Sequence, residues 1–208
     1  MTSVLGLIVA YAIGSIPFAY LAGRAVKGID LRTVGSGNLG ATNVYRILGL
    51  PAAISVLVLD AAKGAVPTLF LPRLLLASSV SPAESVWWAL AYGAAAVAGH
   101  VRPVFLLWKG GGKGVATAGG VFAVLAPWAV LAVTIVLFTV VFATRYMSLA
   151  SVAAALLFPV FVWVSRGSTP VLLASIVTGV LIVWTHRSNL RRLRDGTEAR
   201  LSGRAKSS

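Results

Sequence analysis

Residues 127–143 read PWAVLAVTIVLFTVVFA and contain no charged side chain. An apolar run of this length is typical of a helix that crosses a membrane, because such a helix needs about 20 predominantly apolar residues. A membrane barrel would show short segments of alternating hydrophobicity instead. Similar runs recur along the whole chain, in which 58% of the 208 residues are hydrophobic and only 11% are charged. The sequence therefore predicts an all-α polytopic membrane protein.

We expect seven transmembrane helices. The fourth apolar run is short and could fuse with the fifth, but Pro127 favours a break between them. The N-terminal segment has no basic region before its apolar run and is interpreted as a first span, not a cleaved signal peptide. No soluble domain or internal repeat is evident. The expected spans are residues 3–22, 47–71, 84–101, 115–126, 127–143, 147–164 and 170–186.

The basic residues indicate the orientation of these spans. The net charge is +13, and an N-terminus outside with a cytoplasmic C-terminus places most of the 18 Lys and Arg residues inside. Basic residues of membrane proteins gather on the cytoplasmic side, which explains the charge without a nucleic-acid partner. Fusing the fourth and fifth spans would put the basic tail, about 187–208, outside. We therefore expect seven crossings, N-out and C-in, with the polar loops at the cytoplasmic face.

The first polar motif is GSGNLGATN, residues 35–43, followed by Arg46. Glycines allow close approach of a ligand, and Arg binds phosphate in bidentate fashion. The polar neighbours can add neutral hydrogen bonds, and Thr42 or Asn43 could cap the following helix. The alternative is a tight polar turn with a helix cap. The candidate ligand contacts in this motif are Ser36, Gly37, Asn38, Gly40, Thr42, Asn43 and Arg46.

The second polar motif is KGGGKG, residues 109–114, directly before an expected helix. Consecutive backbone N–H groups and a helix N-terminus favour an anion, and Lys113 adds a full charge. A nucleotide-binding Walker loop is excluded because Gly114 stands where Ser or Thr would be needed. The alternative is a flexible interfacial loop whose lysines extend toward water. The candidate phosphate-binding residues are Gly110, Gly111, Gly112, Lys113 and Gly114.

A third polar group follows the last span, where His186 and Asn189 share a helical face. His186 could bind a phosphate or act as a general base, although an interfacial belt residue is an equal alternative. Ser148 could reach the same polar cavity as His186 and Asn189. Asp60 and Lys63 stand three apart inside the second span, where charges are costly and must pair or face a polar cavity. Structural and functional interpretations of that pair are equally supported.

Taken together, these segments resemble one family, the bacterial integral-membrane acyl-phosphate:glycerol-3-phosphate acyltransferases. The resemblance covers nearly the whole chain. It is carried by GSIPFAYL (residues 14–21), GSGNLGATNVYRILG (35–49), DAAKG (60–64), GHVRPVFLLWKGGGKGVAT (99–117), TRYMSLAS (144–151) and HRSN (186–189).

The resemblance implies one acyltransferase domain spanning residues 1–208, in the bacterial inner membrane with its active site facing the cytoplasm. The implied reaction moves a fatty acyl group from acyl phosphate to the 1-hydroxyl of glycerol 3-phosphate, the first step of bacterial phospholipid synthesis. It yields lysophosphatidic acid and inorganic phosphate. Ser36, Arg46, Lys113 and His186 would be catalytic. Ser148, Asn189 and the remaining motif residues would bind substrate. We expect a monomer in contact with membrane lipids, without metal or cofactor.

Two departures from the family pattern stand out. Three glycines, 110–112, precede the loop lysine where the family commonly has two. Ser188 replaces a usual Glu, so a carboxylate base is missing there. Acyl phosphate carries a good leaving group, so positioning and charge stabilisation can suffice. We expect direct transfer without an acyl-enzyme, with the proton passing to the donor's phosphate or to His186.

Three alternatives remain. A transporter of a phosphorylated metabolite would also need polar groups among helices, and Asp60 with Lys63 favours it. A membrane scaffold without catalysis would not explain three polar groups on one face. An acyl-CoA-dependent acyltransferase is possible. However, the His and Asp with four residues between them that are found in soluble-fold enzymes of that kind are absent, because Phe105 follows His100 and Arg191 follows His186 at that spacing.

Overall fold

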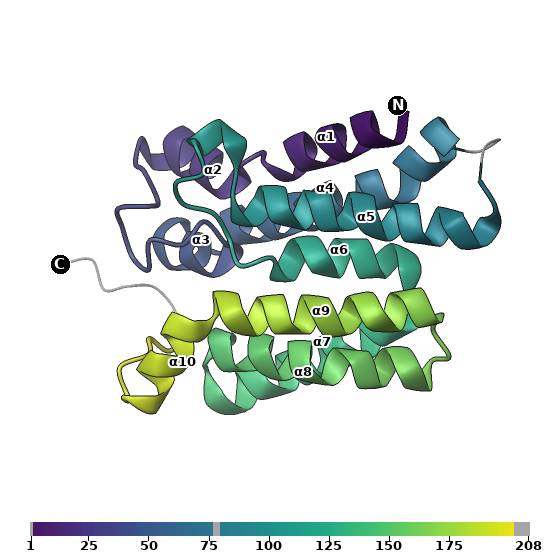
Figure 1. Ribbon diagram of the computed structural model, residues 1–208. Helices are drawn as coiled ribbons and strands as arrows, with labels where there is room; N and C mark the ends of the chain where they lie inside the picture. The colour runs from purple at the N-terminus through teal and green to yellow at the C-terminus, as the bar shows by residue number, and fades with distance from the viewer. Residues whose placement is uncertain (1, 77–79, 202–208) are drawn as a thin grey trace. The chain divides into compact units, whose positions relative to one another are not determined.

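The computed structural model describes residues 2–76 and 80–201, and the elements within them are helices (Figure 1). Continuous apolar runs produce this outcome, because in lipid a helix satisfies every backbone N–H and C=O internally. The elements are α1 (Thr2–Gly14), α2 (Phe18–Lys27), α3 (Ala41–Leu48), α4 (Leu50–Leu76), α5 (Pro82–Val101), the 3₁₀ turn η1 (Val104–Leu106), α6 (Val115–Leu125), α7 (Pro127–Thr144), α8 (Met147–Val164), α9 (Thr169–Thr185) and α10 (Arg187–Arg194).

Within residues 2–76 and 80–201, five segments are long and apolar enough to cross a membrane. A sixth is possible if α9 and α10, which are bent by 57° at His186, count together. Helix α6 has 11 residues and is shorter than each of these segments. The polytopic all-helical fold is therefore confirmed, whereas the count of seven stays a prediction. The five segments are Thr2–Lys27, Leu50–Leu76, Pro82–Leu106, Pro127–Thr144 and Met147–Val164.

The chain forms two compact units, Met1–Val124 and Leu125–Gly203. In the first unit, α1, α4 and α5 pack against one another. Small residues permit this close packing. A methyl group on Gly14 of α1 would overlap the backbone of Ala96 in α5, and one on Gly64 of α4 would overlap the backbone of Thr117 in α6. Backbone approach at glycine is a common way for helices to associate in lipid, where apolar burial gives no driving force.

The sequence predicted one continuous helix for the first span, and this prediction is wrong. Helix α1 ends at Gly14 and α2 begins at Phe18. Pro17 in the break has no backbone N–H, so the regular helical hydrogen-bond pattern cannot run through it. The carbonyl of Ile16 instead accepts a hydrogen bond from Lys63 of α4, at 2.9 Å. The break thus becomes a point of contact between two spans.

In the second unit, α8 packs against both α7 and α9. Helix α10 turns away at the end of α9 (Figure 1). The predicted break at Pro127 is confirmed, because α6 ends at Leu125 and Pro127 is the first residue of α7. Arg145 ends α7 in the left-handed conformation, at φ 63°. Large apolar side chains such as Trp128 and Phe142 point outward, as expected of helices that face lipid.

Candidate active site

The first loop, residues 28–40, joins α2 to α3 and contains most of the first glycine-rich motif. Asn43, in the first turn of α3, is only 1% exposed, and its amide holds this loop closed. The side-chain oxygen accepts a hydrogen bond from the N–H of Ser36 at 2.9 Å. The side-chain nitrogen donates to the carbonyls of Leu31 and Val34, at 3.1 and 3.2 Å.

The predicted helix cap at Thr42 or Asn43 is wrong. Gly40 occupies the N-cap position of α3 without a side-chain hydrogen bond, and both predicted residues lie inside the helix. The physical reason is that the Asn43 amide bonds to the loop that precedes the helix, rather than to the N–H groups of the helix itself.

Ser36 is exposed at the tip of the first loop, between two glycines in the left-handed region. Gly35 has φ 62° and Gly37 has φ 68°, conformations that other residues adopt only with strain. A side chain on Gly35 would also overlap the Asn43 amide. Leu39, 3% exposed, anchors the far end of the loop in an apolar cluster. The loop is therefore a rigid turn that presents a hydroxyl and backbone groups.

The second loop, residues 107–114, lies beside the first. The N–H of Leu39 donates to the carbonyl of Gly111 at 3.3 Å, and the Arg32 guanidinium donates to the carbonyl of Lys109 at 3.3 Å. The structure therefore brings together the two glycine-rich segments that the sequence singled out. Helix α6 begins at Val115, so its N-terminus follows Gly114 directly, as predicted.

Arg32 joins the two loops, and neither it nor Asp30 was singled out from the sequence. Its guanidinium forms an ion pair with Asp30 at 2.6 Å, and it stacks 5.2 Å from the Tyr20 ring centroid. Hydrogen bonds from Arg32 hold the pKa of Asp30 below its usual value. Only the short spacing Asp-x-Arg before the motif could have signalled this contact.

Two candidate cations of the first unit, Arg46 and Lys113, are half-buried. Arg46 lies in the last turn of α3, and Lys113 lies one residue before the Gly114 that precedes α6. Both side chains take part in interactions of their own. Their roles toward substrate remain predictions.

The remaining predicted residues, Ser148, His186 and Asn189, belong to the second unit. His186 is buried at the end of α9, and its Nδ1 lies 2.8 Å from the carbonyl oxygen of Ile182. Because a carbonyl can only accept, this contact requires a proton on Nδ1. In the neutral ring, Nε2 is then the acceptor atom, which suits it to bind a hydroxyl or take a proton.

Ser148 and Asn189 meet at a carboxylate that the sequence did not predict. Glu198 accepts hydrogen bonds from the Ser148 hydroxyl at 2.7 Å and from the Asn189 amide at 2.6 Å. Its second oxygen accepts from Arg192 at 2.7 Å. Burial alone would raise the pKa of Glu198, but the hydrogen bonds from Asn189, Ser148 and Arg192 outweigh it and keep the pKa low. No motif spacing pointed to Glu198.

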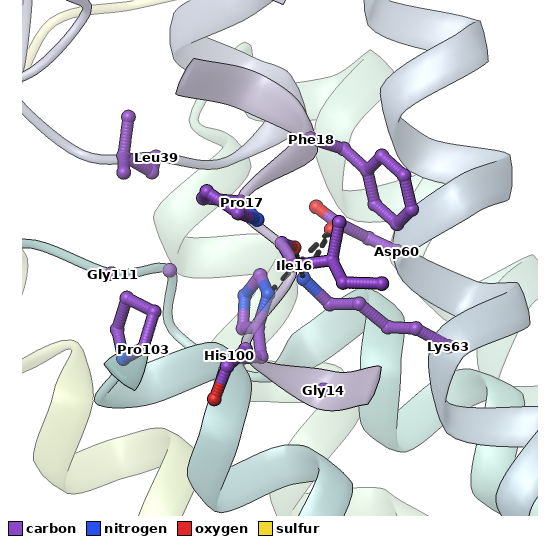
Figure 2. Close-up of a pocket in the computed structure, with 12 residues that line it drawn as sticks. Gly14, Ile16, Pro17, Phe18, Leu39, Asp60, Lys63, His100, Pro103 and Gly111 are labelled. Carbon is purple, nitrogen blue, oxygen red and sulfur yellow. Dashed lines mark hydrogen bonds and ion pairs between the residues drawn. The ribbon is translucent and has the colours of Figure 1, made fainter. Parts of the chain in front are cut away.

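A buried cluster of Asp60, Lys63 and His100 lies in the first unit, with side chains 3–5% exposed (Figure 2). Lys63 Nζ lies 2.7 Å from Asp60 Oδ1, and His100 Nδ1 lies 3.6 Å from the same oxygen. The cluster lines a cavity together with Gly111, Gly112 and the α1–α2 break. The cavity measures about 10 Å³, which is the room of roughly one water molecule. It is too small to hold a phosphorylated substrate.

Comparison with known proteins identifies the family. The family model for glycerol-3-phosphate acyltransferases matches residues 4–196. A glycerol-3-phosphate acyltransferase of a Synechococcus species is 45% identical over 208 residues, which cover 100% of this chain and 99% of the relative. That of Geobacter sulfurreducens is 45% identical, over 92% of this chain and 94% of its own length.

Two solved structures share the fold. Both are crystal structures of PlsY, an integral membrane glycerol 3-phosphate acyltransferase. The glycerol 3-phosphate form matches with a TM-score of 0.86 and 39% identity, over 97% of this chain and 96% of that one. The lysophosphatidic acid form matches with a TM-score of 0.84 and 38% identity, over 96% and 95%. The chain described here therefore belongs to the integral-membrane glycerol-3-phosphate acyltransferase family and is an enzyme of that family.

Proposed function

We propose that this enzyme transfers a fatty acyl group from acyl phosphate to the 1-hydroxyl of glycerol 3-phosphate, giving lysophosphatidic acid and inorganic phosphate. The observation that carries the proposal is the direct hydrogen bonding between the two glycine-rich loops. Their backbone groups, together with Arg46 and Lys113, offer the chemistry that a phosphate requires. The relative whose structure is solved was captured with this substrate and this product.

The reaction needs no covalent enzyme intermediate. The glycerol hydroxyl oxygen attacks the acyl carbon, the bond from that carbon to the phosphate oxygen breaks, and the hydroxyl proton leaves with the phosphate or passes to His186. Positive charge from Arg46 and Lys113 would stabilise the negative charge that develops on the acyl oxygen and the leaving phosphate. Since Nδ1 of His186 donates to Ile182, Nε2 is the atom that would accept a proton.

The remaining candidates keep binding roles in this proposal. The glycines of both loops would let a phosphate approach the backbone closely, and Ser36 would offer its hydroxyl, because the N–H groups of Ser36, Gly37 and Gly112 already donate to Asn43, Val34 and His100. Ser148 donates its hydroxyl proton to Glu198, which leaves the hydroxyl oxygen as an acceptor, and the Asn189 amide also donates to Glu198. We therefore assign Ser148 to a substrate hydroxyl and Asn189 to substrate binding, and we assign no metal or cofactor.

We also propose that the enzyme is a monomer in the bacterial inner membrane, with seven crossings and its active site toward the cytoplasm. The distribution of basic residues supports the orientation. Membership of an acyltransferase family sets aside the transporter and scaffold alternatives. The acyl donor is the part of the proposal that needs a direct test.

The donor test uses purified protein in detergent with glycerol 3-phosphate and either palmitoyl phosphate or palmitoyl-CoA, without added metal. We expect lysophosphatidic acid and inorganic phosphate from palmitoyl phosphate alone. Product from the CoA thioester alone would overturn the donor and the direct mechanism. An acyl group trapped on any serine during turnover would overturn direct transfer even if the donor is correct.

A further inference from the structure

The buried cluster of Asp60, Lys63 and His100 places ionisable side chains inside the apolar first unit. Asp60 and Lys63 lie one turn apart on α4, well inside a membrane-spanning helix, and both are almost fully buried. Ionisable groups at such a depth are costly and mark functional positions more often than not. Burying an ion pair is also a poor way to stabilise a fold, since apolar residues of similar volume often do as well or better.

Lys63 holds the first span in place. Its ammonium donates to the carbonyl of Ile16 at 2.9 Å and lies 5.5 Å from the centre of the Phe18 ring, in addition to its pairing with Asp60. These contacts connect α4 to the α1–α2 break. The same break lines the cavity under the second loop.

His100 connects the cluster to the second loop. Nδ1 of its ring faces Asp60, and the opposite edge, carrying Nε2, lies against Gly112 so closely that a methyl group there would overlap the ring. The N–H of Gly112 also donates to the carbonyl of His100 at 3.1 Å. Ring and backbone of one residue thus fix Gly112, and Figure 2 shows the ring between the carboxylate and the loop.

We propose that the buried cluster is a set of positioning residues that holds the second loop where it receives the phosphate of glycerol 3-phosphate. Asp60 orients the His100 ring, the ring sets the position of Gly112, and Lys63 fixes the neighbouring wall and neutralises Asp60. The cluster acts through the loop and does not touch the substrate. This inference rests on the proposed function and adds to it that the second loop takes the phosphate of glycerol 3-phosphate rather than that of the acyl donor.

The first experiment separates positioning from stability. Asp60→Asn leaves Lys63 without its counter-charge, and Lys63→Met leaves Asp60 without its ammonium, so each lowers the melting temperature in detergent. The double variant D60L/K63M leaves no unpaired charge, and its melting temperature returns close to that of the wild type. Its KM for glycerol 3-phosphate stays raised about tenfold or more, because misplacing a binding group by about 1 Å can cost on the order of 100-fold.

The KM for the acyl donor should change much less than the KM for glycerol 3-phosphate. Thr68→Val is the matched control, because Thr68 is buried on the same helix and its hydroxyl donates to the carbonyl of Gly64, four residues before it. It should leave both KM values at wild-type level. A stable D60L/K63M enzyme with an unchanged KM for glycerol 3-phosphate would show that the ion pair is purely structural and would overturn the proposal.

A second set of variants does not depend on the ion pair. Gly112→Ala forces a methyl group against the His100 ring and should raise the KM for glycerol 3-phosphate. In H100A/G112A the methyl group occupies room that the ring has left. The fold-increase in KM for the double variant should therefore be smaller than the product of the fold-increases for the two single variants. Fully multiplicative effects would contradict a direct contact between ring and loop.

Failure of this inference is distinguishable from failure of the proposed function. Product formation by the wild-type enzyme tests acyl transfer. The affinity of each variant for glycerol 3-phosphate, measured as thermal stabilisation by that substrate without any acyl donor, tests the loop. Loss of this stabilisation in D60L/K63M, with the wild type and Thr68→Val both stabilised, would support the positioning role. Equal stabilisation of all three would oppose it.

Discussion

At the scale of single residues, Asn43 shows how a predicted substrate contact can serve the architecture of its own loop. The sequence concentrates polar side chains between residues 36 and 46 but does not say which of them face a ligand. Asn43 is buried and bonds to three backbone groups of the first loop, whereas Ser36 is exposed. Composition predicted a polar, glycine-rich loop. Only the fold shows which backbone carbonyls accept hydrogen bonds from the Asn43 amide.

Asn43→Asp is therefore expected to damage both stability and substrate binding. A carboxylate can still accept from the N–H of Ser36, but it cannot donate to Leu31 and Val34, and an abandoned buried acceptor costs about 1–3 kcal/mol. We expect a lower melting temperature and a higher KM for glycerol 3-phosphate. Thr33→Ala is the control, because Thr33 is exposed in the same loop. An N43D enzyme with wild-type values would contradict this account.

At the scale of elements, α10 and the segment after it are held by one carboxylate. Glu198 joins Ser148 of α8 to Asn189 and Arg192 of α10, and the N–H of Leu201 donates to the carbonyl of Arg145. The sequence predicted His186, Ser148 and Asn189 as a group. It could not predict Glu198, because Glu198 follows a turn after α10 and belongs to none of the recognised motifs.

The lowered pKa of Glu198 predicts a specific dependence of stability on pH. A carboxyl group with a lower pKa in the folded state stabilises the fold above its unfolded pKa, near the ordinary value of 4.5, and loses that contribution as pH falls through the folded pKa. The difference in melting temperature between wild type and Glu198→Gln should be largest near neutral pH and shrink below about pH 4.5. Thermal melts in detergent from pH 3.5 to 7 would measure it.

Asp195→Asn is the control for the Glu198 prediction. Asp195 carries the same charge, also after α10, but it is half-exposed and pairs with an exposed Arg194. Removing its charge should change the melting temperature little at any pH, as is usual for surface ion pairs. A pH-independent difference between wild type and E198Q would mean that hydrogen bonding and not charge holds the segment.

At the scale of the whole molecule, the sequence predicted the apolar helices well and the interruptions less well. Helices α7 and α8 begin at the predicted residues, because Pro127 and the polar Thr144–Tyr146 boundary are strong local signals. The separate helix α3, ended at Gly49, and the break before Phe18 were missed. Both interruptions have a local signal, Pro17 and Gly49, that the apolar pattern obscured. The contact of Lys63 with the Ile16 carbonyl joins distant segments and has no such signal. Local periodicity carries no record of such contacts.

The number of membrane crossings can be decided by finding on which side of the membrane each loop lies, because an odd and an even number place the chain end on different sides. If α6 and α7 cross separately, the first loop and the chain end after α10 lie on the same side, whereas a single crossing by both would place them on opposite sides. The chain has no native cysteine. Thr33→Cys, Ser168→Cys and Thr197→Cys therefore each provide one labelling site, at positions that are exposed in the structure.

In intact cells, a membrane-impermeant maleimide should label only the cysteine at position 168, and the other two only after permeabilisation. The reason is electrostatic. Arg24, Lys27 and Arg32 lie in or just before the first loop, Lys109 and Lys113 lie in the second loop, and α10 is rich in Arg. The positive-inside tendency favours their retention in the cytoplasm together. Labelling of T197C and not S168C from outside, with T33C protected, would mean six crossings. The short helix α6 would then share a crossing with α7, and the basic C-terminal tail would lie on the outer face despite its charge.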